Sequence, residues 1–373
     1  MKISVLGGGL VGGAIARDLA ADHDVTVFDI RESLLSSFSE PIRTQRTDLS
    51  RGKNIRNAVK DADLAVGAVP GFMGYATVEA VIGAGRDIVD ISFFPEDGSG
   101  LHEAAVKNGV RCLLDFGVAP GCSNLICGRS LETFHSIESF ICMVGGLPEE
   151  RRLPWEYQAP FSPSDVLEEY TRPARIIRNG REVTLEPLTE IQPVDFAGVG
   201  TLEAFLTDGL RSLLRIEGIP EMVEKTLRYP GYVQKVKLLS DSGFLSPEPL
   251  KGKDVSPLEL SSALLFEAWK QNPGDRDITV MRVEILGSTS EGKKVKEVWE
   301  MLDRYDDATA TTSMARTTGY TCTAGVRMLE RELWTEPGAF SPEHVGRNGE
   351  CFDFIMENLR RRGVVFKVGK GEV

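Results

Sequence analysis

A glycine-rich segment that directly follows a short apolar run is the feature that most constrains the fold. Residues 2–6 (Lys-Ile-Ser-Val-Leu) have the composition of a buried strand, and Gly7-Gly8-Gly9-Leu10-Val11-Gly12 follows without a break. Apolar residues then recur at helical spacing, at Leu10, Ala14, Ile15 and Leu19. This order predicts a strand, a tight glycine turn and a helix that begins inside the turn.

The positions of the glycines predict that this turn binds a dinucleotide. Gly7 permits the tight turn, Gly9 lets the backbone approach a pyrophosphate, and Gly12 lets the helix pack closely on the strand. The helix N-terminus offers free N–H groups and the positive end of its dipole. Asp29 ends a second strand-like run about 20 residues further on, where a carboxylate accepts hydrogen bonds from ribose hydroxyls. An ordinary strand-to-helix turn is the alternative, but it does not account for Asp29.

The same acidic residue bears on the choice of cofactor. A carboxylate at Asp29 would repel a 2′-phosphate, which favours NAD over NADP. The neighbouring Arg31 leaves NADP open, because an arginine just past the strand can pair with that phosphate. The residues predicted to bind the cofactor are Gly7, Gly9, Leu10, Val11, Gly12, Asp29, Ile30, Asp48, Val69 and Pro70.

Strand and helix patterns alternate along the first 124 residues, which predicts βαβ units and a Rossmann-type, doubly wound parallel sheet. The expected strands cover residues 2–6, 25–28, 41–46, 63–69, 86–91 and 110–114, and the expected helices cover 31–40, 54–60, 75–84 and 101–107. Ligands of such sheets bind outside the carboxyl ends of the strands. Residues 67–72, 90–97 and 115–124 should meet there, although each segment alone also reads as a plain turn.

The pattern changes after residue 124 and predicts an α+β second domain with a mostly antiparallel sheet. Residues 136–144 are strand-like, and residues 279–287 and 294–302 have the alternation of a β-hairpin. Helices are expected at 164–170, 201–214, 221–227 and 257–271, then at 312–333 and 352–361. We therefore expect a dinucleotide-binding domain at 1–124, completed by 312–373, and a substrate and dimerisation domain at 125–311.

Composition and charge exclude several classes of function. The net charge of −12 and the lack of basic runs argue against nucleic acid as a partner, and no apolar stretch reaches the roughly 18 residues of a membrane helix. The sequence begins directly with a strand, so a cytoplasmic protein is expected. Six cysteines without a CxxC pair should be reduced and buried. Four scattered histidines give no metal-binding spacing.

Several segments together resemble the NAD-dependent lysine 6-dehydrogenases of the saccharopine dehydrogenase superfamily, over nearly the whole chain. The segments that carry the resemblance are 6–9 (Leu-Gly-Gly-Gly), 115–121 (Asp-Phe-Gly-Val-Ala-Pro-Gly), 144–148 (Val-Gly-Gly-Leu-Pro), 172–180 (Arg-Pro-Ala-Arg-Ile-Ile-Arg-Asn-Gly) and 314–320 (Met-Ala-Arg-Thr-Thr-Gly-Tyr).

The resemblance implies an NAD-dependent oxidative deamination of L-lysine at the ε-amine. The product would be the 6-semialdehyde, which cyclises to 1-piperideine-6-carboxylate, and the protein would be a homodimer. Superfamily members also act on saccharopine and carboxylated polyamines, so a saccharopine- or carboxynorspermidine-type dehydrogenase or reductase is an alternative. A protein that senses nucleotides without catalysis is an alternative of another class, because fold alone does not establish activity.

This chemistry needs a carboxylate to take a proton from the amine and a cation to bind the substrate carboxylate. Glu96 and Asp115, after the fifth and sixth expected strands, are the candidate acids, with a loop or helix-cap role as the alternative. The candidates in the second domain are Arg172, Arg175, Arg211 and Tyr157, and a surface ion pair is the alternative for each arginine. His102 and Arg316 are weaker candidates. The substrate is expected in a cleft between the two domains.

Overall fold

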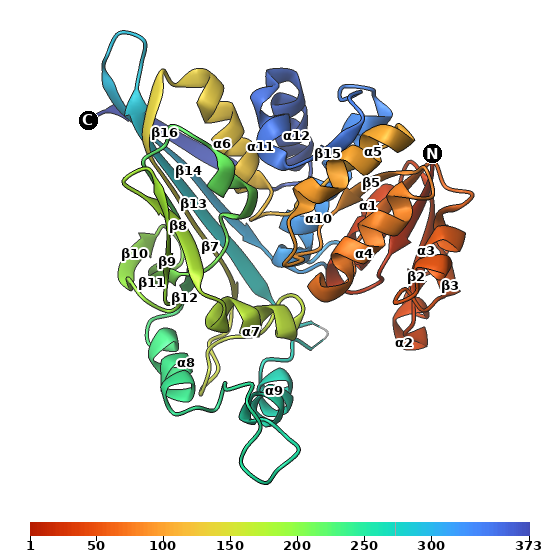
Figure 1. The fold of residues 1–373 in the computed structure, drawn as a ribbon, viewed down its shortest axis with the longest axis horizontal. Helices are drawn as coiled ribbons and strands as arrows, with labels where there is room; N and C mark the ends of the chain where they lie inside the picture. Colours follow the sequence, from red (N-terminus) through yellow and green to blue (C-terminus); the bar gives the residue numbers. More distant parts are fainter. Residues whose placement is uncertain (273) are drawn as a thin grey trace. The chain divides into compact units, whose positions relative to one another are not determined.

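The structure is a computed structural model that describes residues 1–272 and 274–373. Packing divides the chain into two units (Figure 1), one made of Met1–Thr133 and Met314–Val365 and the other of Phe134–Ser313 and Phe366–Val373. These limits differ from the expected boundaries at 124 and 312. Helix α6 (Cys122–Thr133) packs in the first unit against α11 (Pro342–Arg347) through close backbone contacts at Gly128 and Gly346. The last strand, β16 (Phe366–Glu372), pairs in the second unit.

The first unit contains a sheet of seven parallel strands, in the order β15-β6-β5-β4-β1-β2-β3. Its strands are β1 (Lys2–Leu6), β2 (Asp24–Asp29), β3 (Arg43–Arg46), β4 (Leu64–Gly67), β5 (Asp87–Asp90), β6 (Arg111–Leu113) and β15 (Gly338–Phe340). The parallel Rossmann-type sheet is therefore confirmed, and only the three-residue β15 lies outside the predicted strands.

Helices complete the first unit. They are α1 (Leu10–Leu19), α2 (Glu32–Leu35), α3 (Gly52–Val59), α4 (Gly71–Ile82), α5 (His102–Asn108), α6, α10 (Ser313–Glu330), α11 and α12 (Gly349–Arg361). Helix α10 packs through small residues, since a Cβ on Gly319 would lie 3.2 Å from Ile15 of α1. Helix α2 is much shorter than the predicted 31–40, because the Ser36 and Ser37 hydroxyls bond to backbone carbonyls and end the helix early.

The second unit is built on a nine-stranded sheet, in the order β10-β11-β12-β7-β13-β14-β16, with β8 paired to β12 and β9. Its strands are β7 (Ser136–Pro148), β8 (Ala174–Arg178), β9 (Arg181–Leu185), β10 (Gln192–Phe196), β11 (Gly200–Leu206), β12 (Glu221–Arg228), β13 (Asp277–Ser288), β14 (Lys294–Arg304) and β16. All its pairings are antiparallel except β12 with β7. The mostly antiparallel second sheet and the β13–β14 hairpin are confirmed.

Two predicted helices in this unit are wrong. Residues 201–206 and 221–227 are the strands β11 and β12, and only a short 3₁₀ helix, η2 (Arg211–Arg215), is helical there. Strand β12 is buried on both faces, with Met222, Thr226 and Arg228 on one side and Leu227 on the other. A strand covered on both sides lacks the alternation of apolar and polar residues that marks a half-buried strand.

Three helices pack together at one end of the second sheet (Figure 1). They are α7 (Pro163–Thr171), α8 (Tyr232–Asp241) and α9 (Pro257–Ala268), and α7 and α9 match the predicted helices. Their shared core includes Tyr157, Tyr170, Tyr232 and Trp269. This aromatic core contacts the buried guanidinium of Arg228.

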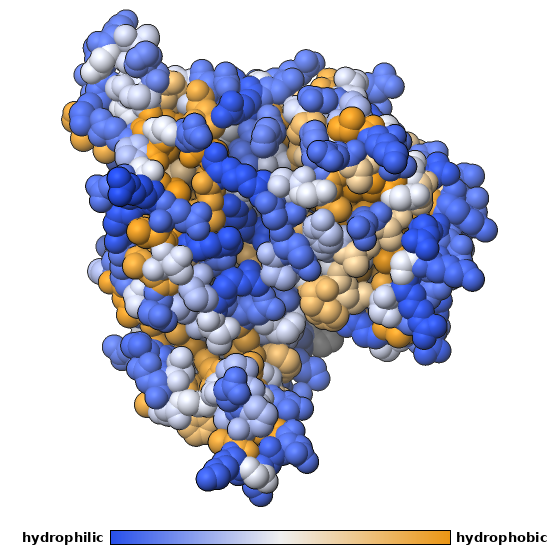
Figure 2. Space-filling view, viewed as in Figure 1, coloured by the Kyte–Doolittle hydropathy of each residue, from blue (hydrophilic) through white to orange (hydrophobic). Residues whose placement is uncertain are grey.

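One face of the molecule is mostly hydrophilic (Figure 2). On the face in Figure 2, charged and polar residues cover most of the area and apolar residues occur in small groups among them. Within residues 1–272 and 274–373, no helix is long and apolar enough to cross a membrane. All six cysteines are free thiols and buried, as predicted; burial raises the pKa of Cys122 to about 12, which keeps this thiol protonated.

Candidate functional site

The glycine turn after β1 is shaped by close backbone packing. Gly7 has a φ of +110°, and its N–H donates to the Phe28 carbonyl at 2.8 Å. A Cβ on Gly7 would lie 2.7 Å from the carbonyl carbon of Ala68, and a Cβ on Gly12 would lie 3.0 Å from the carbonyl carbon of Gly7. Both positions therefore need glycine for the fold itself, to let α1 pack against the turn and the loop after β4.

Gly9 is different, because the space beside it is open. A Cβ on Gly9 would meet nothing closer than the Arg31 Nη2, at 3.8 Å. Gly9 is also the N-cap of α1, and no side chain caps this helix. An uncapped helix N-terminus beside an open glycine is the arrangement that receives a phosphate group. These residues fit the pyrophosphate of a dinucleotide.

The Asp29 carboxylate is buried at the carboxyl end of β2 and holds the turn together. It accepts the Gly8 N–H at 2.9 Å, the Arg31 N–H at 2.9 Å, and both the Nε and the Nη2 of Arg31 at 3.2 Å. Burial alone would raise the pKa of Asp29, but these hydrogen bonds hold it below its ordinary value. Asp29 is thus an anion at the carboxyl end of β2, and the exposed Arg31 side chain is folded back onto it.

Apolar side chains stand exposed at the same edge of the sheet. Leu10 is 50% exposed, Ile30 is 53% exposed and Phe72 is 73% exposed, at the carboxyl ends of β1, β2 and β4. Exposed apolar side chains grouped at one edge are typical of a surface that a ligand covers. Of the other predicted cofactor residues, Val69 is buried and Pro70 is the N-cap of α4.

Asp48, which follows β3, has a local role. Its carboxylate accepts the N–H and the hydroxyl of Ser50, at 3.0 Å and 2.6 Å, and pairs with Arg51 at 3.4 Å. These hydrogen bonds lower the pKa of Asp48.

The two candidate acids are in contrasting environments. Asp115 is 7% exposed, lies two residues after the end of β6 and has a φ of +57°, an unfavourable conformation for a residue other than glycine. The next residue donates its N–H to the Asp90 carbonyl at 2.9 Å, which ties this turn to the end of β5. Glu96 is exposed in the loop that follows β5. A strained, buried carboxylate at this edge is the more typical functional residue.

Two of the predicted arginines in the second unit make ion pairs with their own unit. Arg172 pairs with Glu168 of α7. Arg175, on β8, donates its Nε and Nη2 to the buried Asp208 at 2.9 Å and 2.8 Å. Arg211 begins η2 with a φ of +51°.

The most buried guanidinium of this unit belongs to Arg228, which the sequence reasoning missed. Its Nη2 donates to the Tyr170 hydroxyl at 3.1 Å and to Glu169 at 3.2 Å, and its carbon lies 4.5 Å from the centre of the Tyr157 ring. Burial raises the pKa of Glu169 to about 7 in spite of this arginine. Tyr157, predicted as a substrate ligand, is 3% exposed and part of this core. The sequence could have indicated Arg228, because it is a charged residue at the end of a strand that precedes a Pro-Gly turn. It was missed because residues 221–227 were predicted as a helix.

The two weaker candidates make contacts with backbone carbonyls. The His102 Nδ1 lies 3.1 Å from the Ala339 carbonyl, and Arg316 donates to the Arg362 carbonyl at 2.9 Å.

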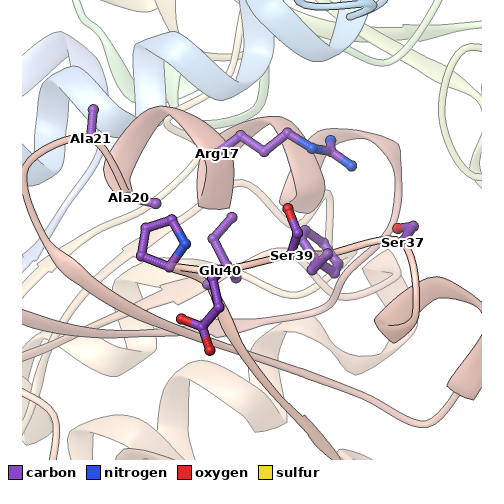
Figure 3. Close-up of a pocket in the computed structure, with 9 residues that line it drawn as sticks. Arg17, Ala20, Ala21, Ser37, Ser39 and Glu40 are labelled. Atoms are coloured by element: carbon purple, nitrogen blue, oxygen red, sulfur yellow. The ribbon is translucent and has the colours of Figure 1, made fainter.

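A hollow of about 340 Å³ lies beside the C-terminal half of α1 (Figure 3). Arg17 stands in it over the Phe38 ring, with Ser39 and Glu40 on the facing segment. None of the turn residues 7–9 lines this hollow, so it is separate from the dinucleotide site.

Comparison with known proteins agrees with this geometry. The saccharopine dehydrogenase NADP binding domain matches residues 3–113, and the saccharopine dehydrogenase C-terminal domain matches residues 117–364. The chain is 24% identical to the saccharopine dehydrogenase [NADP(+), L-glutamate-forming] of Schizosaccharomyces pombe, over 95% of this chain and 97% of the relative. It is 23% identical to the mitochondrial alpha-aminoadipic semialdehyde synthase of Mus musculus, over 72% of this chain and 30% of that protein.

Solved structures share the fold. The saccharopine dehydrogenase (L-Glu forming) of Saccharomyces cerevisiae superposes with a TM-score of 0.83 at 19% identity, over 99% of both chains. The homospermidine synthase of Legionella pneumophila, solved with NAD, superposes with a TM-score of 0.66 at 13% identity, over 100% of this chain and 91% of that chain. Because the two domain matches together span most of the sequence, the chain belongs to the saccharopine dehydrogenase family.

Proposed function

We propose that this oxidoreductase removes a hydride from the carbon that bears the ε-amine of L-lysine, with NAD as acceptor, and forms the 6-semialdehyde. The observation that carries the proposal is the buried Asp115, held in a strained conformation at the sheet edge of a dinucleotide-binding unit of this family. The reaction needs a carboxylate there, because lysine enters as an ammonium with a pKa of about 10.4.

The proposed reaction has three steps, which are proton transfer, hydride transfer and hydrolysis. Asp115 accepts a proton from the ammonium, and the hydride then leaves the ε-carbon, which gives an iminium ion on the substrate. A bound nicotinamide dinucleotide supplies the hydride acceptor. Water adds to the iminium carbon, and loss of ammonia yields the aldehyde. The strained turn at Asp115 keeps the carboxylate in one orientation, so little reorganisation accompanies the proton transfer.

For the substrate carboxylate we propose Arg211, one of the predicted arginines, together with Arg228. The Arg175 fork is already occupied by Asp208 through two hydrogen bonds. The Nη1 and Nη2 of Arg228 also have partners, but its buried Nε has no hydrogen-bond partner among the described residues. A buried donor without a partner is costly, and a bound carboxylate would satisfy it.

Saccharopine is the second candidate substrate, because the relative that this chain matches over 97% of the relative's length is a saccharopine dehydrogenase. The oxidised carbon would be the same, the amine would be secondary, and water would release glutamate in place of ammonia. Two further carboxylates would then need cations, which favours a site with several arginines.

The cofactor proposal follows from the residues at the end of β2. The ionised Asp29 favours the 2′-hydroxyl of NAD over the 2′-phosphate of NADP. Arg31 supports NADP as the second candidate, since its exposed guanidinium can turn from Asp29 towards a phosphate.

The test is a substrate panel followed by absorbance of the reduced nicotinamide. Purified protein is given NAD or NADP and, in turn, L-lysine, saccharopine and 1,5-diaminopentane, which is lysine without its carboxylate. The proposal predicts NAD reduction with L-lysine, and an Arg211→Met variant with a raised KM for L-lysine and an unchanged KM for 1,5-diaminopentane. Reduction with saccharopine alone would establish the second candidate. Cofactor binding without reduction by any amine would favour a nucleotide-sensing protein.

A further inference from the structure

The segment that leads from β11 to η2 is buried and held from two sides. Thr207 and Asp208 are 3% and 5% exposed, and Leu210 is 1% exposed. The segment ends at Arg211, whose φ of +51° is unfavourable for an arginine. A backbone in such a conformation persists only when its surroundings fix it.

The first clamp on this segment is an ion pair. Asp208 accepts the backbone N–H of Arg175 at 3.1 Å, in addition to both hydrogen bonds from its guanidinium. The bidentate geometry fixes the position and the orientation of the Asp208 side chain.

The second clamp is a buried carboxyl group from the neighbouring strand. Glu224 of β12 is 7% exposed and accepts the Thr207 hydroxyl at 2.7 Å, and Thr207 lies 2.8 Å from the Thr226 hydroxyl. The carboxyl group also lies against the backbone of Gly209, where a Cβ would come within 2.7 Å of the Glu224 Cγ. No side chain fits at position 209 while Glu224 stays in this place.

We propose that Glu224 is a positioning residue: its neutral carboxyl group fixes the segment 207–211 that presents Arg211, and loss of its proton releases that segment. The inference rests on the proposed function only where it takes Arg211 as a ligand of the substrate. The conformational part concerns the protein alone and can be tested without a substrate.

The charges around Glu224 explain why ionisation would release the segment. Two acids, Asp208 just after β11 and Glu169 on α7, disfavour a negative charge on Glu224. Arg228, on the same strand as Glu224, favours that charge. Burial, with these two acids, raises the pKa of Glu224 to about 8. Cys142 of β7 is the register partner of Glu224 and is also buried. A carboxylate formed here would be desolvated and would repel Asp208, so the backbone beside it would move towards water.

The direct test is the rate of tryptic cleavage after Arg211 and Arg215, followed by mass spectrometry at about pH 7 and about pH 9 and normalised to a synthetic peptide of the same sequence. In the unmodified protein, cleavage should be at least about fivefold faster at the higher pH, since Glu224 is then mostly ionised. Glu224→Gln should remove this difference, because the amide fills the same space without a charge. Glu291→Gln, in the exposed β13–β14 turn, is the matched control and should keep it.

Gly209→Ala tests the same clamp without removing the acid. Its methyl group would displace the Glu224 carboxyl group, so rapid cleavage is expected already at about pH 7. If Glu224→Gln does not fold, Gly209→Ala alone tests whether Glu224 fixes the segment 207–211. Equal cleavage at both pH values in the unmodified protein, or an equal rise in Glu224→Gln, would overturn the proposal, as would slow cleavage of Gly209→Ala.

Kinetics give the second readout. The KM for L-lysine should rise between about pH 7 and about pH 9 in the unmodified protein. This rise should be at least about fivefold larger than the rise in Glu224→Gln, and the two proteins should have similar kcat values. A parallel change in kcat, with the same KM in both proteins, would contradict the positioning role. If L-lysine is not a substrate, the proposed function fails while the cleavage assay still decides the role of Glu224.

Discussion

Two glycines of the same turn should respond to alanine in opposite ways. At Gly9 the backbone has a φ of −65°, which suits alanine, and the nearest atom to a new methyl group is 3.8 Å away. Alanine is a poorer N-cap than glycine by up to about 1 kcal/mol, but it lowers the entropy of the unfolded chain by about 0.4–1 kcal/mol. The free energy of unfolding of Gly9→Ala should therefore stay within about 1 kcal/mol of the original.

The cofactor affinity of Gly9→Ala should fall, because the methyl group takes the space through which a phosphate approaches the helix N-terminus. We expect Kd to rise about ten- to 100-fold, which corresponds to about 1.4–2.8 kcal/mol. In Gly12→Ala the methyl group would instead overlap the Gly7 carbonyl group, a backbone contact that cannot turn away. Overpacking of this kind costs about 1–3 kcal/mol of stability.

Urea unfolding and titration calorimetry with NAD and NADP measure the two effects separately. The expected pattern is a stable Gly9→Ala with weak cofactor binding and a destabilised Gly12→Ala. Normal affinity in Gly9→Ala would refute the placement of the pyrophosphate. Unchanged stability in Gly12→Ala would refute the packing argument.

Three further predictions concern charged residues. Arg31→Ala should raise the Kd for NADP at least about tenfold while changing the Kd for NAD less, and Asp29→Ala should reduce the preference for NAD; calorimetry with both cofactors measures this. Asp115→Asn should lower kcat at neutral pH by at least about 100-fold and shift the pH–rate profile to alkaline values, whereas Glu96→Gln, at an exposed site, should keep kcat within about twofold. Glu169→Gln should flatten the pH dependence of stability. Between about pH 4.5 and pH 7 the folded protein keeps a proton on Glu169 that the unfolded chain has released, so the original protein loses up to about 1.4 kcal/mol per pH unit there. Urea unfolding at several pH values checks this, and an equal slope in both proteins would contradict it.

The first unit could be predicted from the sequence because its signals are local. The first two strands, the glycine turn between them and the acid at the end of β2 all lie within about 30 residues of the chain, the length of one βαβ unit. Parallel strands have their carboxyl ends at one edge of the sheet, so the order of strands in the sequence places Gly9 and Asp115 at that edge. The open space beside Gly9 and the burial of Asp115 are seen only in the structure.

The second unit was harder to predict because its pairings are distant in sequence. Strand β12 pairs with β7 about 80 residues earlier, and it is buried on both faces, so residues 221–227 looked helical. The role of Arg175 depends on its ion-pair partner Asp208, which lies 33 residues further along the chain, between β11 and η2. A motif of arginines shows that positive charge is present, but only the fold shows which guanidinium is already occupied.

The most direct measurement of the proposed reaction is the transfer of deuterium from L-lysine that carries two deuterium atoms at the ε-carbon. The protein is incubated with NAD and the labelled lysine, and the reduced nicotinamide is examined by mass spectrometry, alongside the Asp115→Asn variant. We predict one deuterium in the reduced nicotinamide and a labelled six-membered imine as product, with turnover in Asp115→Asn reduced at least about 100-fold at neutral pH. Reduced nicotinamide without deuterium, or full turnover in Asp115→Asn, would contradict the proposed reaction and its proton acceptor.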